Sequence, residues 1–376
     1  MRETMIEALR VPGSSEASLN LEVFARDEDH VREGLLRAAD GSWFPILRGV
    51  PSFLDGAADP EWIDFCARHG LALPTRGAGD ARAAQQAMTT QTFSDKWRRF
   101  KNYGLEPGHE TFLFDWYAKK FGLADRAELP DFYACRSRIL EVGPGSGFNT
   151  RFMARHCRGE VFALDISEAA DTTFENTRTL PNCTVVRADL MAAPFADESF
   201  DLVVADGVLH HTPDTRAAVE ALYRKVRPGG QFFFYVYKQM GPARRFCDDH
   251  IRSTFTRMTP DACYGACEPI TELGRELSRI GGTVTLSRPI DVLGIPAGTH
   301  DVQRLIYYSF LKCFWNEAFD FETNNMVNFD WYHPHDAWQH SVEEVEGWLT
   351  DLGVAKFQVN DANPNGISVL LTRPSD

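Results

Sequence analysis

The chain has 376 residues, of which 44% are hydrophobic and 24% are charged, and its formal net charge at pH 7 is −14. This composition is ordinary for a globular protein, and the length predicts one large domain with an appendage, or two domains. The negative charge repels phosphate backbones and anionic lipid, so we expect neither nucleic acid nor a membrane surface as the main partner.

Nothing in the sequence predicts secretion or membrane insertion. No apolar run approaches the ~18 residues of a spanning helix, and the N-terminal segment MRETMIEALRVPGSS lacks the apolar region of a signal peptide. The eight cysteines are scattered, with Cys263 and Cys267 as the one close pair. We therefore expect reduced thiols and a cytoplasmic protein.

The first 56 residues predict a small β appendage. The segment LNLEVFAR alternates apolar and polar residues, and an Asp40–Gly41 turn leads into SWFPILRGVPSFL. The appendage ends where a helical pattern begins.

Residues 57–135 predict a helical lead-in. Within it, Phe112 and Trp116 are expected on an apolar helix face, and Lys119 and Lys120 on a charged one. The small and polar residues 78–91 predict a linker or mobile segment.

From residue 138 to 238, short apolar runs alternate with helical patterns. The runs RILEV, EVFALD, CTVVRAD, FDLVVAD and QFFFYVY predict five strands. One intervening helix is expected to carry Val219, Leu222, Tyr223 and Val226 on its buried face. This rhythm is typical of a parallel sheet covered on both faces, and we expect an α/β core.

The core is predicted to span residues 136–238 and 341–376, interrupted by an aromatic-rich helical insertion over 239–340. After the insertion, Ser341 and Glu344 form a capping box that opens a helix. KFQVND and GISVLLTR then predict two strands joined by an N-P-N-G turn.

Three glycines, Gly143, Gly145 and Gly147, directly follow the first predicted core strand. Ligands of parallel sheets bind beyond the carboxyl ends of the strands, and glycine lets the backbone approach them closely. A tight turn without a ligand is the alternative. Phe148 stands where a dinucleotide fingerprint needs a small residue, so the pattern disfavours NAD.

Carboxylates end the neighbouring strands. Asp165 closes the second strand, where NAD sites and S-adenosylmethionine sites both place a carboxylate that accepts the two hydroxyls of a ribose. Asp189 follows the third strand, within reach of an adenine amino group, and Asp206 follows the fourth.

Four segments in order, LEVGPGSG, ALD at 163–165, ADLMAAPFADESFDLVVADGVLHH and LYRKVRPGGQFFF, resemble the class I S-adenosylmethionine-dependent methyltransferases, with a core of the type 11/25 kind. The resemblance implies a Rossmann-like sheet of seven strands, parallel except for one antiparallel terminal strand, and S-adenosylmethionine as the cofactor. It implies cofactor contacts from Glu141, Gly143, Gly145 and Gly147 at the methionine end, Asp165 and Ile166 at the ribose, Asp189 and Leu190 at the adenine, and Asp206 near the sulfonium.

The flanking segments carry weaker resemblances. Residues 35–54 resemble the second half of a zinc-ribbon-like leader found before some such methyltransferases, but no cysteine precedes Cys66. We therefore expect no metal there, and a packing or dimerisation role instead. QTFSDKWRRFKNYG resembles a helical segment that folds over the cofactor, in which Trp97 and Tyr103 either close the site or pack on the core.

The insertion lies where this superfamily commonly builds a substrate lid. FDWYHPHDAWQHS at 329–341 resembles a stretch that precedes the final helix in related enzymes. The expected acceptor-binding residues are Tyr237, Trp331, Tyr332 and His333. Such aromatic density suits an apolar or planar acceptor, or it fills a core.

Methyl transfer to an acceptor that carries a proton needs a base, and histidine has a suitable pKa. The candidates are His211 and His340, with His210 beside them; the alternative is that each is a structural histidine. A metal held by His333, His335 and His340 with Asp330 or Asp336 is a further alternative, which we do not expect.

The sequence thus predicts a cytoplasmic methyltransferase for a small molecule, such as a secondary metabolite, and a homodimer is compatible with it. An NAD-dependent oxidoreductase and a non-catalytic S-adenosylmethionine-binding protein are the alternatives.

Overall fold

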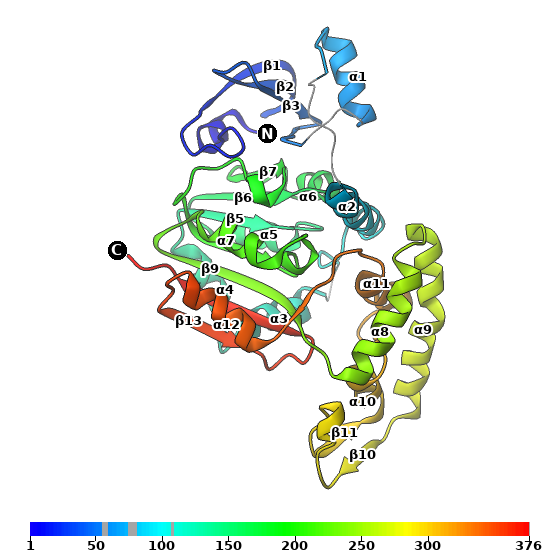
Figure 1. Ribbon diagram of the computed structural model, residues 1–376. Helices are drawn as coiled ribbons and strands as arrows, with labels where there is room; N and C mark the ends of the chain where they lie inside the picture. Colours follow the sequence, from blue (N-terminus) through cyan, green and yellow to red (C-terminus); the bar gives the residue numbers. More distant parts are fainter. Residues whose placement is uncertain (55–58, 74–80, 107–108, 376) are drawn as a thin grey trace.

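A mixed β-sheet forms the centre of the protein (Figure 1), in a computed structural model that describes residues 1–54, 59–73, 81–106 and 109–375. Strand β14 is antiparallel to both of its neighbours, and the other neighbouring pairs on this path are parallel. This arrangement confirms the predicted Rossmann-like sheet. The order is β13 (Lys356–Asn360), β14 (Gly366–Thr372), β9 (Val226–Lys238), β8 (Phe200–Asp206), β5 (Arg138–Val142), β6 (Glu160–Asp165) and β7 (Cys183–Arg187).

Helices cover both faces of the sheet. Because side chains alternate along each strand, successive residues are buried on opposite faces. In β8, Leu202 and Val204 join one core cluster, whereas Val203 and Ala205 join another. The first cluster lies under α3 (His109–Lys120), α4 (Leu129–Ala134) and α5 (Phe148–His156), beside which α6 (Ala169–Thr177) packs; the second lies under α7 (Thr215–Tyr223) and α12 (Val342–Asp351).

The structure corrects the predicted end of helix α7 and shows how helix α12 begins. Helix α7 ends at Tyr223, and Val226, expected on its buried face, instead opens β9. At the start of α12, the Oγ of Ser341 accepts a hydrogen bond from the amide of Glu344 at 3.1 Å, as the capping box predicts. The carboxylate of Glu344 lies 3.1 Å from Nδ1 of His340, which precedes the cap.

The N-terminal appendage is an antiparallel sheet, as expected. The Asp40–Gly41 turn joins two of its strands, with the carboxylate of Asp40 accepting from the amide of Ser42 at 2.8 Å. Its elements are η1 (Glu3–Ala8), β1 (Leu19–Asp27), β2 (His30–Ala38), β3 (Trp43–Leu47) and β4 (Val50–Pro51), followed by α1 (Pro60–His69).

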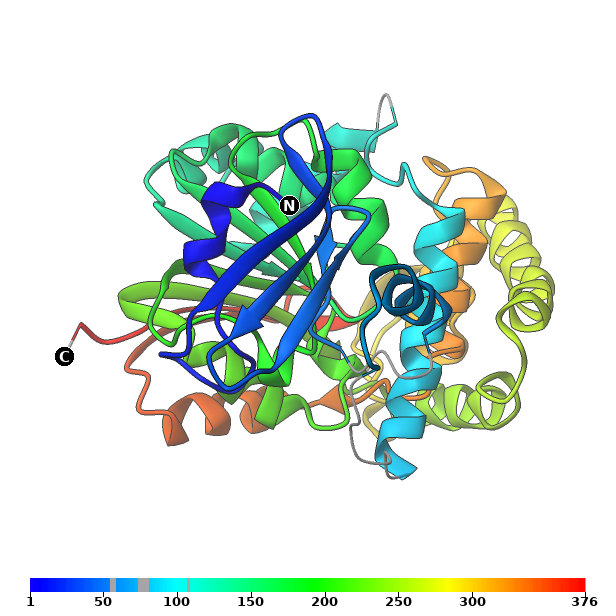
Figure 2. The same ribbon diagram turned by 90° about the horizontal axis from the view of Figure 1, so that it is seen from above.

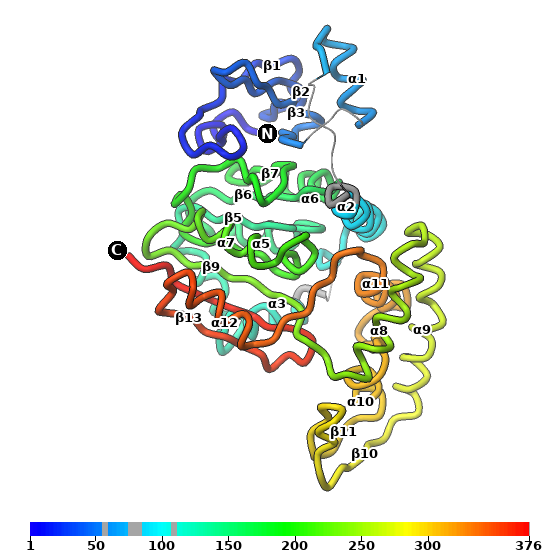
Figure 3. The backbone as a smooth tube through the Cα atoms, viewed as in Figure 1, coloured from blue at the N-terminus to red at the C-terminus, as the bar shows by residue number. Residues whose placement is uncertain are grey.

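This appendage covers the free edge of the central sheet at β7 (Figure 3). The amide of Phe53 donates to the carbonyl of Arg187 at 2.8 Å, and the amide of Arg10 donates to that of Pro194 at 2.9 Å. An uncovered edge strand is a template for aggregation, so the appendage has a packing role within the chain.

The lead-in differs from its prediction. Residues 81–91, expected in a linker, form the first turns of α2 (Ala81–Arg99), and residues 78–80 lie outside the described residues. Small residues such as alanine favour helix, which explains the error. In α3, Phe112 and Trp116 are 43% and 36% exposed and Lys120 is buried, so the predicted apolar and charged faces are wrong.

The insertion, residues 239–340, forms a group of helices beside the carboxyl ends of the strands (Figures 1 and 2). Helices α9 and α11 pack together, and a β10–β11 hairpin projects from their end. Among the described residues, no helix has the length and apolarity needed to cross a bilayer. The elements are α8 (Pro242–Phe255), α9 (Pro260–Ile280), β10 (Thr283–Leu286), η5 (Asp291–Leu293), β11 (Gly298–Asp301), α10 (Val302–Ser309), α11 (Phe321–Tyr332) and β12 (Gln339–His340), which pairs with β9.

Candidate functional site

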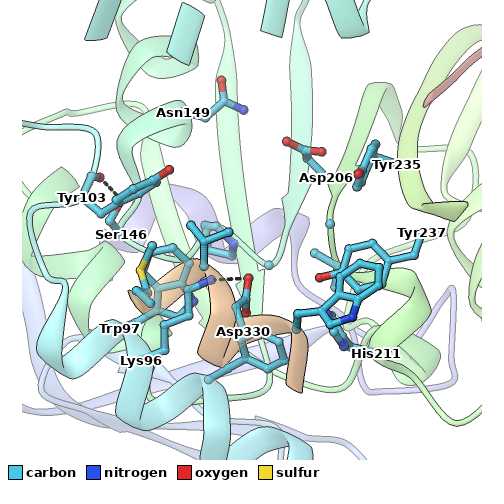
Figure 4. A pocket seen from close by; sticks show the side chains of 18 of the residues that line it. Lys96, Trp97, Tyr103, Ser146, Asn149, Asp206, His211, Tyr235, Tyr237 and Asp330 are labelled. Carbon is cyan, nitrogen blue, oxygen red and sulfur yellow. Dashed lines mark hydrogen bonds and ion pairs between the residues drawn. The ribbon is translucent and has the colours of Figure 1, made fainter. Parts of the chain in front are cut away.

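A cavity of about 620 Å³ lies between the carboxyl ends of the central strands and the helical insertion (Figure 4). Residues of α2 and α3 close one side of it, and residues of α10, α11 and the β13–β14 turn close the other. Nearly all sequence-predicted cofactor residues line this cavity: Glu141, Gly143, Asp165, Ile166, Asp189, Leu190 and Asp206.

The glycine turn needs its glycines for conformation and for space. Gly143, Gly145 and Gly147 have φ values of +67°, +61° and +78°, a left-handed region that side chains disfavour. A Cβ on Gly145 would lie 2.5 Å from the ring of Trp97, and one on Gly143 would overlap Val208. Gly143 lines the cavity, whereas Gly145 and Gly147 support the turn from behind.

Glu141 lies at the base of the turn with only 4% of its surface exposed. One carboxylate oxygen accepts from Nδ2 of Asn149 at 2.9 Å, and the other accepts from the hydroxyl of Thr150. Burial raises the pKa of this carboxyl to about 7. The two donors come from α5, so Glu141 couples the turn to the helix that follows it.

Asp165 ends β6 with one oxygen already engaged. Its Oδ1 accepts from the amide of Ser167 at 2.8 Å and from the hydroxyl of the same residue at 2.7 Å. Burial raises the pKa of this carboxyl. Oδ2 therefore has the greater capacity to accept a hydrogen bond from a ligand. Oδ1 has less capacity for the second ribose hydroxyl that the sequence predicts at this carboxylate.

Asp189 and Leu190 lie at the next strand end, where η3 (Leu190–Ala192) begins. The carboxylate of Asp189 accepts from the amide of Met191 at 2.9 Å and from Nε2 of Gln86 at 3.2 Å. Gln86 belongs to α2, so the lead-in helix reaches across this end of the cavity.

Helix α2 and the segment that follows it contribute further lining residues. Trp97 and Tyr103 both line the cavity, and the hydroxyl of Ser146 donates to the carbonyl of Tyr103 at 2.7 Å. Nζ of Lys96 lies 3.0 Å from Oδ2 of Asp330 (Figure 4). Within the described ranges, the buried Oδ1 of Asp330 has no hydrogen-bond partner.

A second ion pair lies at the end of β8. Nζ of Lys120 is 2.6 Å from Oδ1 of Asp206, and both side chains line the cavity. The ammonium group also lies 3.3 Å from the ring centroid of Trp116 and 4.1 Å from that of Tyr235. Burial lowers the pKa of Lys120, and Asp206 offsets part of this effect.

Among the three candidate catalytic histidines, only His211 lines the cavity. It ends η4 (Leu209–His211), and its Nδ1 lies 2.7 Å from the carbonyl oxygen of Asp336. A carbonyl only accepts, so Nδ1 carries the proton and Nε2 keeps its lone pair. Burial lowers the pKa of the imidazole to about 4, so it is neutral at physiological pH.

The other two histidines lie away from the lining. His210 is fully buried and stacks on Tyr237 at a ring-centroid distance of 3.6 Å. Nε2 of His340 lies 3.0 Å from the hydroxyl of Thr215, and its Nδ1 contacts Glu344. Both ring nitrogens of His340 therefore already have side-chain partners, one on α12 and one on α7.

The predicted acceptor residues divide in the same way. Tyr237 and Trp331 line the cavity with ring centroids 4.4 Å apart (Tyr237 is labelled in Figure 4). Tyr332 does not line it, and its hydroxyl donates to the carbonyl of Lys312 at 3.0 Å. His333 also lies outside the lining, between the hydroxyl of Thr92 at 2.7 Å and the carbonyl of Met258 at 3.1 Å.

Sequence reasoning missed a group of polar lining residues on the lead-in helices α2 and α3, on the insertion and on the terminal hairpin. Their only sequence signals were the aromatic run that begins LIYYSFLK and the N-P-N-G motif, neither of which indicates a direction for a side chain. The missed residues are Lys96, Lys120, Arg304, Tyr307, Tyr308, Lys312, Asn363 and Asn365.

The alternative metal cluster is not assembled. Nδ1 of His335 contacts Oδ1 of its neighbour Asp336 at 3.1 Å, whereas His333 and His340 have the separate partners described above. Across the described part of the chain, no three His, Cys, Asp or Glu side chains are placed to hold a metal ion.

Comparison with known proteins identifies the segment that carries the glycine turn. Residues 140–234 match the family model of a methyltransferase domain. Cycloartenol-C-24-methyltransferase of Arabidopsis thaliana is 33% identical over 102 residues, which cover 26% of this chain and 30% of that protein. The mitochondrial arginine-hydroxylase NDUFAF5 of Homo sapiens is 30% identical over 155 residues, covering 40% of this chain and 43% of that protein.

The matched segment thus spans less than half the length of either curated relative. Among solved structures, 1,6-didemethyltoxoflavin-N1-methyltransferase of Burkholderia thailandensis aligns with a TM-score of 0.41 at 12% sequence identity. That alignment covers 80% of this chain and 94% of the solved chain.

Proposed function

We propose that this chain, whose residues 140–234 match the model of a methyltransferase domain, is a class I S-adenosylmethionine-dependent methyltransferase acting on a small-molecule acceptor. One observation carries the proposal: a single cavity joins the carboxylates of Glu141 and Asp165 to the aromatic walls of Tyr237 and Trp331. Direct methyl transfer requires that donor and acceptor meet in one enclosed space.

The residues at the strand ends fit the cofactor. When bound, S-adenosylmethionine supplies a methyl group on a positively charged sulfonium, which a nucleophile displaces. Gly143 lets the backbone approach the ligand, Oδ2 of Asp165 can accept from a ribose hydroxyl, and Asp189 and Leu190 stand at the adenine end. Glu141, Asp165 and Asp189 form no ion pair with another described residue, and such carboxylates suit a donor that carries a sulfonium and an ammonium group.

The start of α5 favours this cofactor over NAD. A dinucleotide places its pyrophosphate at the N-terminus of this helix. Here the lead-in segment contacts that end, since the hydroxyl of Ser146 donates to the carbonyl of Tyr103 and a Cβ on Gly104 would lie 2.7 Å from the ring of Phe148. These contacts support a cofactor without a pyrophosphate.

We assign the proton-accepting role to His211. Its carbonyl partner on Asp336 orients the ring and holds the proton on Nδ1, so Nε2 can accept a proton from the acceptor. Asp330 stands in the same cavity with a buried oxygen that has no partner among the described residues, which supports a role in orienting an N–H or O–H group.

The size of the cavity supports a small acceptor. Its volume of about 620 Å³ falls within the ~300–1,000 Å³ range of small-molecule sites and must hold both ligands. The net charge of −14 argues against a nucleic-acid acceptor, and the eight free cysteines support work in a reducing cytoplasm.

Calorimetric titration of the full chain with S-adenosylhomocysteine and, separately, with NADH tests the cofactor. We expect saturable binding of S-adenosylhomocysteine and none of NADH; the opposite result would falsify the proposal. Transfer of a labelled methyl group from S-adenosylmethionine to a panel of phenols, amines and carboxylic acids then tests catalysis. A protein that binds the cofactor but methylates no member would support the non-catalytic alternative.

A further inference from the structure

The charges that line the cavity are separated along its length. Two ion pairs, Lys96 with Asp330 and Lys120 with Asp206, are internally neutral. The remaining carboxylates, Glu141, Asp165 and Asp189, are at the proposed cofactor end. The remaining cations, Arg304 and Lys312, come from the insertion, and no ion pair joins either one to a carboxylate in the described part of the chain.

Lys312 is the more unusual of these two cations. It is only 5% exposed, and its Nζ lies 4.2 Å from the ring centroid of Trp331 and 5.7 Å from that of Tyr307. Burial, together with the nearby Arg244, lowers the pKa of Lys312 to about 7. A buried ammonium group without a counter-ion is costly, and an anion beside it would remove that cost.

Asp248, the carboxylate with the larger effect on the pKa of Lys312, already has hydrogen-bond partners. Both oxygens of Asp248 lie 2.9 Å from Nε of Arg244, and Oδ2 also accepts from Nε1 of Trp331 at 2.9 Å. The side chains of Arg244 and Asp248 are 0% and 1% exposed, so the two residues form a fully buried ion pair. Asp330, the other carboxylate that raises the pKa of Lys312, pairs with Lys96. Among the described residues, no ion pair joins either carboxylate to Lys312.

The backbone that carries Lys312 is held in place by buried side chains. Tyr332 donates to the carbonyl of Lys312 at 3.0 Å, and Nε2 of Gln303 donates to the carbonyl of Cys313 at 2.9 Å. Oδ1 of Asn328 accepts from the amide of Phe314, and Oδ1 of Asn324 from the amide of Asn316, each at 2.7 Å. Such support from two helices, α10 and α11, is typical of a pre-organised binding site.

Arg304 approaches the same aromatic ring from α10. Its Cζ lies 5.6 Å from the ring centroid of Tyr307, the ring that Lys312 also contacts. The hydroxyl of Tyr307 accepts from Nδ2 of Asn365 at 2.8 Å, which ties α10 to the β13–β14 turn. Arg304 also donates to the carbonyl of Trp315 at 3.2 Å. The insertion thus places two cations at one end of the cavity, beside the amide groups of the β13–β14 turn, and neither cation forms an ion pair within the described ranges.

We propose that the methyl acceptor carries an anionic oxygen group, a carboxylate or a phosphate, that binds to Lys312 and Arg304. The aromatic walls contact the rest of the acceptor, and the anionic group sets its orientation toward His211. The inference rests on the proposed function, because it names the acceptor class of the same cavity. Charge-assisted hydrogen bonds of this kind give both affinity and direction.

Three matched aromatic probes test the inference on the full chain saturated with S-adenosylhomocysteine. The probes are 4-hydroxybenzoate, 4-hydroxyphenyl phosphate and the neutral 4-hydroxybenzamide, titrated by calorimetry. We expect at least one anion to bind about tenfold or more tightly than the amide. The preferred anion distinguishes a carboxylate from a phosphate. Equal affinities, or no saturable binding of either anion up to about 10 mM, overturn the inference.

Variants locate the binding. Lys312→Met removes the charge with little change in volume and is expected to abolish the preference for the anion, whereas Lys312→Arg keeps it. Lys356→Met makes the same change at an exposed site on β13 and is expected to have no effect. A preference that survives in Lys312→Met contradicts the inference, as does its loss in Lys356→Met.

A second variant guards against misfolding of the first. Arg304→Gln changes a side chain that is only half-buried, and it is expected to weaken the binding of the preferred anion severalfold. No change in this variant and in Lys312→Met together contradicts the inference. The probe titrations are repeated without S-adenosylhomocysteine, so that the preference for an anion is measured independently of the cofactor. Failure to bind S-adenosylhomocysteine refutes the proposed function, whereas loss of the preference refutes only the inference about the acceptor.

Discussion

Nζ of Lys120 lies 2.6 Å from Oδ1 of Asp206, and the two side chains are only 4% and 10% exposed. The pair joins the lead-in helix α3 to the end of β8, across the wall of the cavity. It also places a cation beside the carboxylate that the family resemblance locates near the sulfonium. The lead-in is thus part of the site as well as its cover.

Replacing Lys120 by Met should destabilise the protein, because Asp206 would remain buried without its partner. Losing one member of a buried pair costs about 3 kcal/mol or more. Urea unfolding should show a lower midpoint with an unchanged slope. The same substitution at the neighbouring, exposed Lys119 is the control and should shift the midpoint little. Equal effects at both positions would show that the pair does not stabilise the fold.

Replacing Asp165 by Ala should weaken the binding of S-adenosylhomocysteine about tenfold or more, since a charge-assisted hydrogen bond contributes about 1.5–3 kcal/mol. Calorimetry measures the affinity, and circular dichroism confirms the fold. Asp171→Ala on α6 is the control, because Asp171 pairs with Arg48 outside the cavity. Unchanged affinity in Asp165→Ala would remove this residue from the cofactor site.

The imidazole of His211 should stay neutral, with its proton on Nδ1, throughout the range from pH 8 to pH 5. The sign follows from burial, which disfavours the cation and lowers the pKa from 6.5 to about 4. Long-range proton–nitrogen NMR spectra, assigned with His211→Gln, report both the tautomer and the titration. A proton on Nε2 would contradict the assigned role, and a midpoint near 6.5 would contradict the effect of burial on this imidazole.

Replacing Phe53 by Ala should destabilise the protein by about 3 kcal/mol, since this side chain is 5% exposed and belongs to the core shared with the central sheet. Affinity for S-adenosylhomocysteine should not change, because Phe53 does not line the cavity. Phe246→Ala is the control at a site that is 74% exposed. A loss at Phe53 no larger than at Phe246 would mean that the appendage does not stabilise the core.

The sequence predicts most of the residues that line the proposed cofactor end of the cavity, because the fold itself brings them together. Parallel strands end at one edge of a sheet, so Glu141, Asp165 and Asp206 had to lie close to one another. The glycine turn adds a local signal, since left-handed backbone requires particular residues. The strand ends and the glycine turn are both properties of the backbone, and the order of residues in the sequence is enough to predict them.

The other half depends on directions that a sequence does not record. Lys119 and Lys120 are neighbours on α3, yet the rotation of about 100° per residue separates an exposed lysine from a buried ion pair. His210 and His211 differ in the same way: one stacks behind Tyr237 and the other lines the cavity. His340 was linked to the site through a motif, but β12 holds it against Thr215.

The insertion was the least predictable region. Its contribution to the cavity arises from how α10 and the segment after it dock on α11, through asparagines that the sequence shows only as polar residues. Their burial is a tertiary property, and so is the exposure of Lys312 to the cavity.

A crystal structure of the full chain with S-adenosylhomocysteine tests the central claim most directly. The account predicts the ligand at the carboxyl ends of β5, β6 and β8, with a ribose hydroxyl in hydrogen-bond contact with Asp165 and the sulfur facing the side of the cavity lined by His211 and Tyr237. A ligand bound elsewhere, or one whose ribose contacts neither Asp165 nor its neighbours, would contradict it.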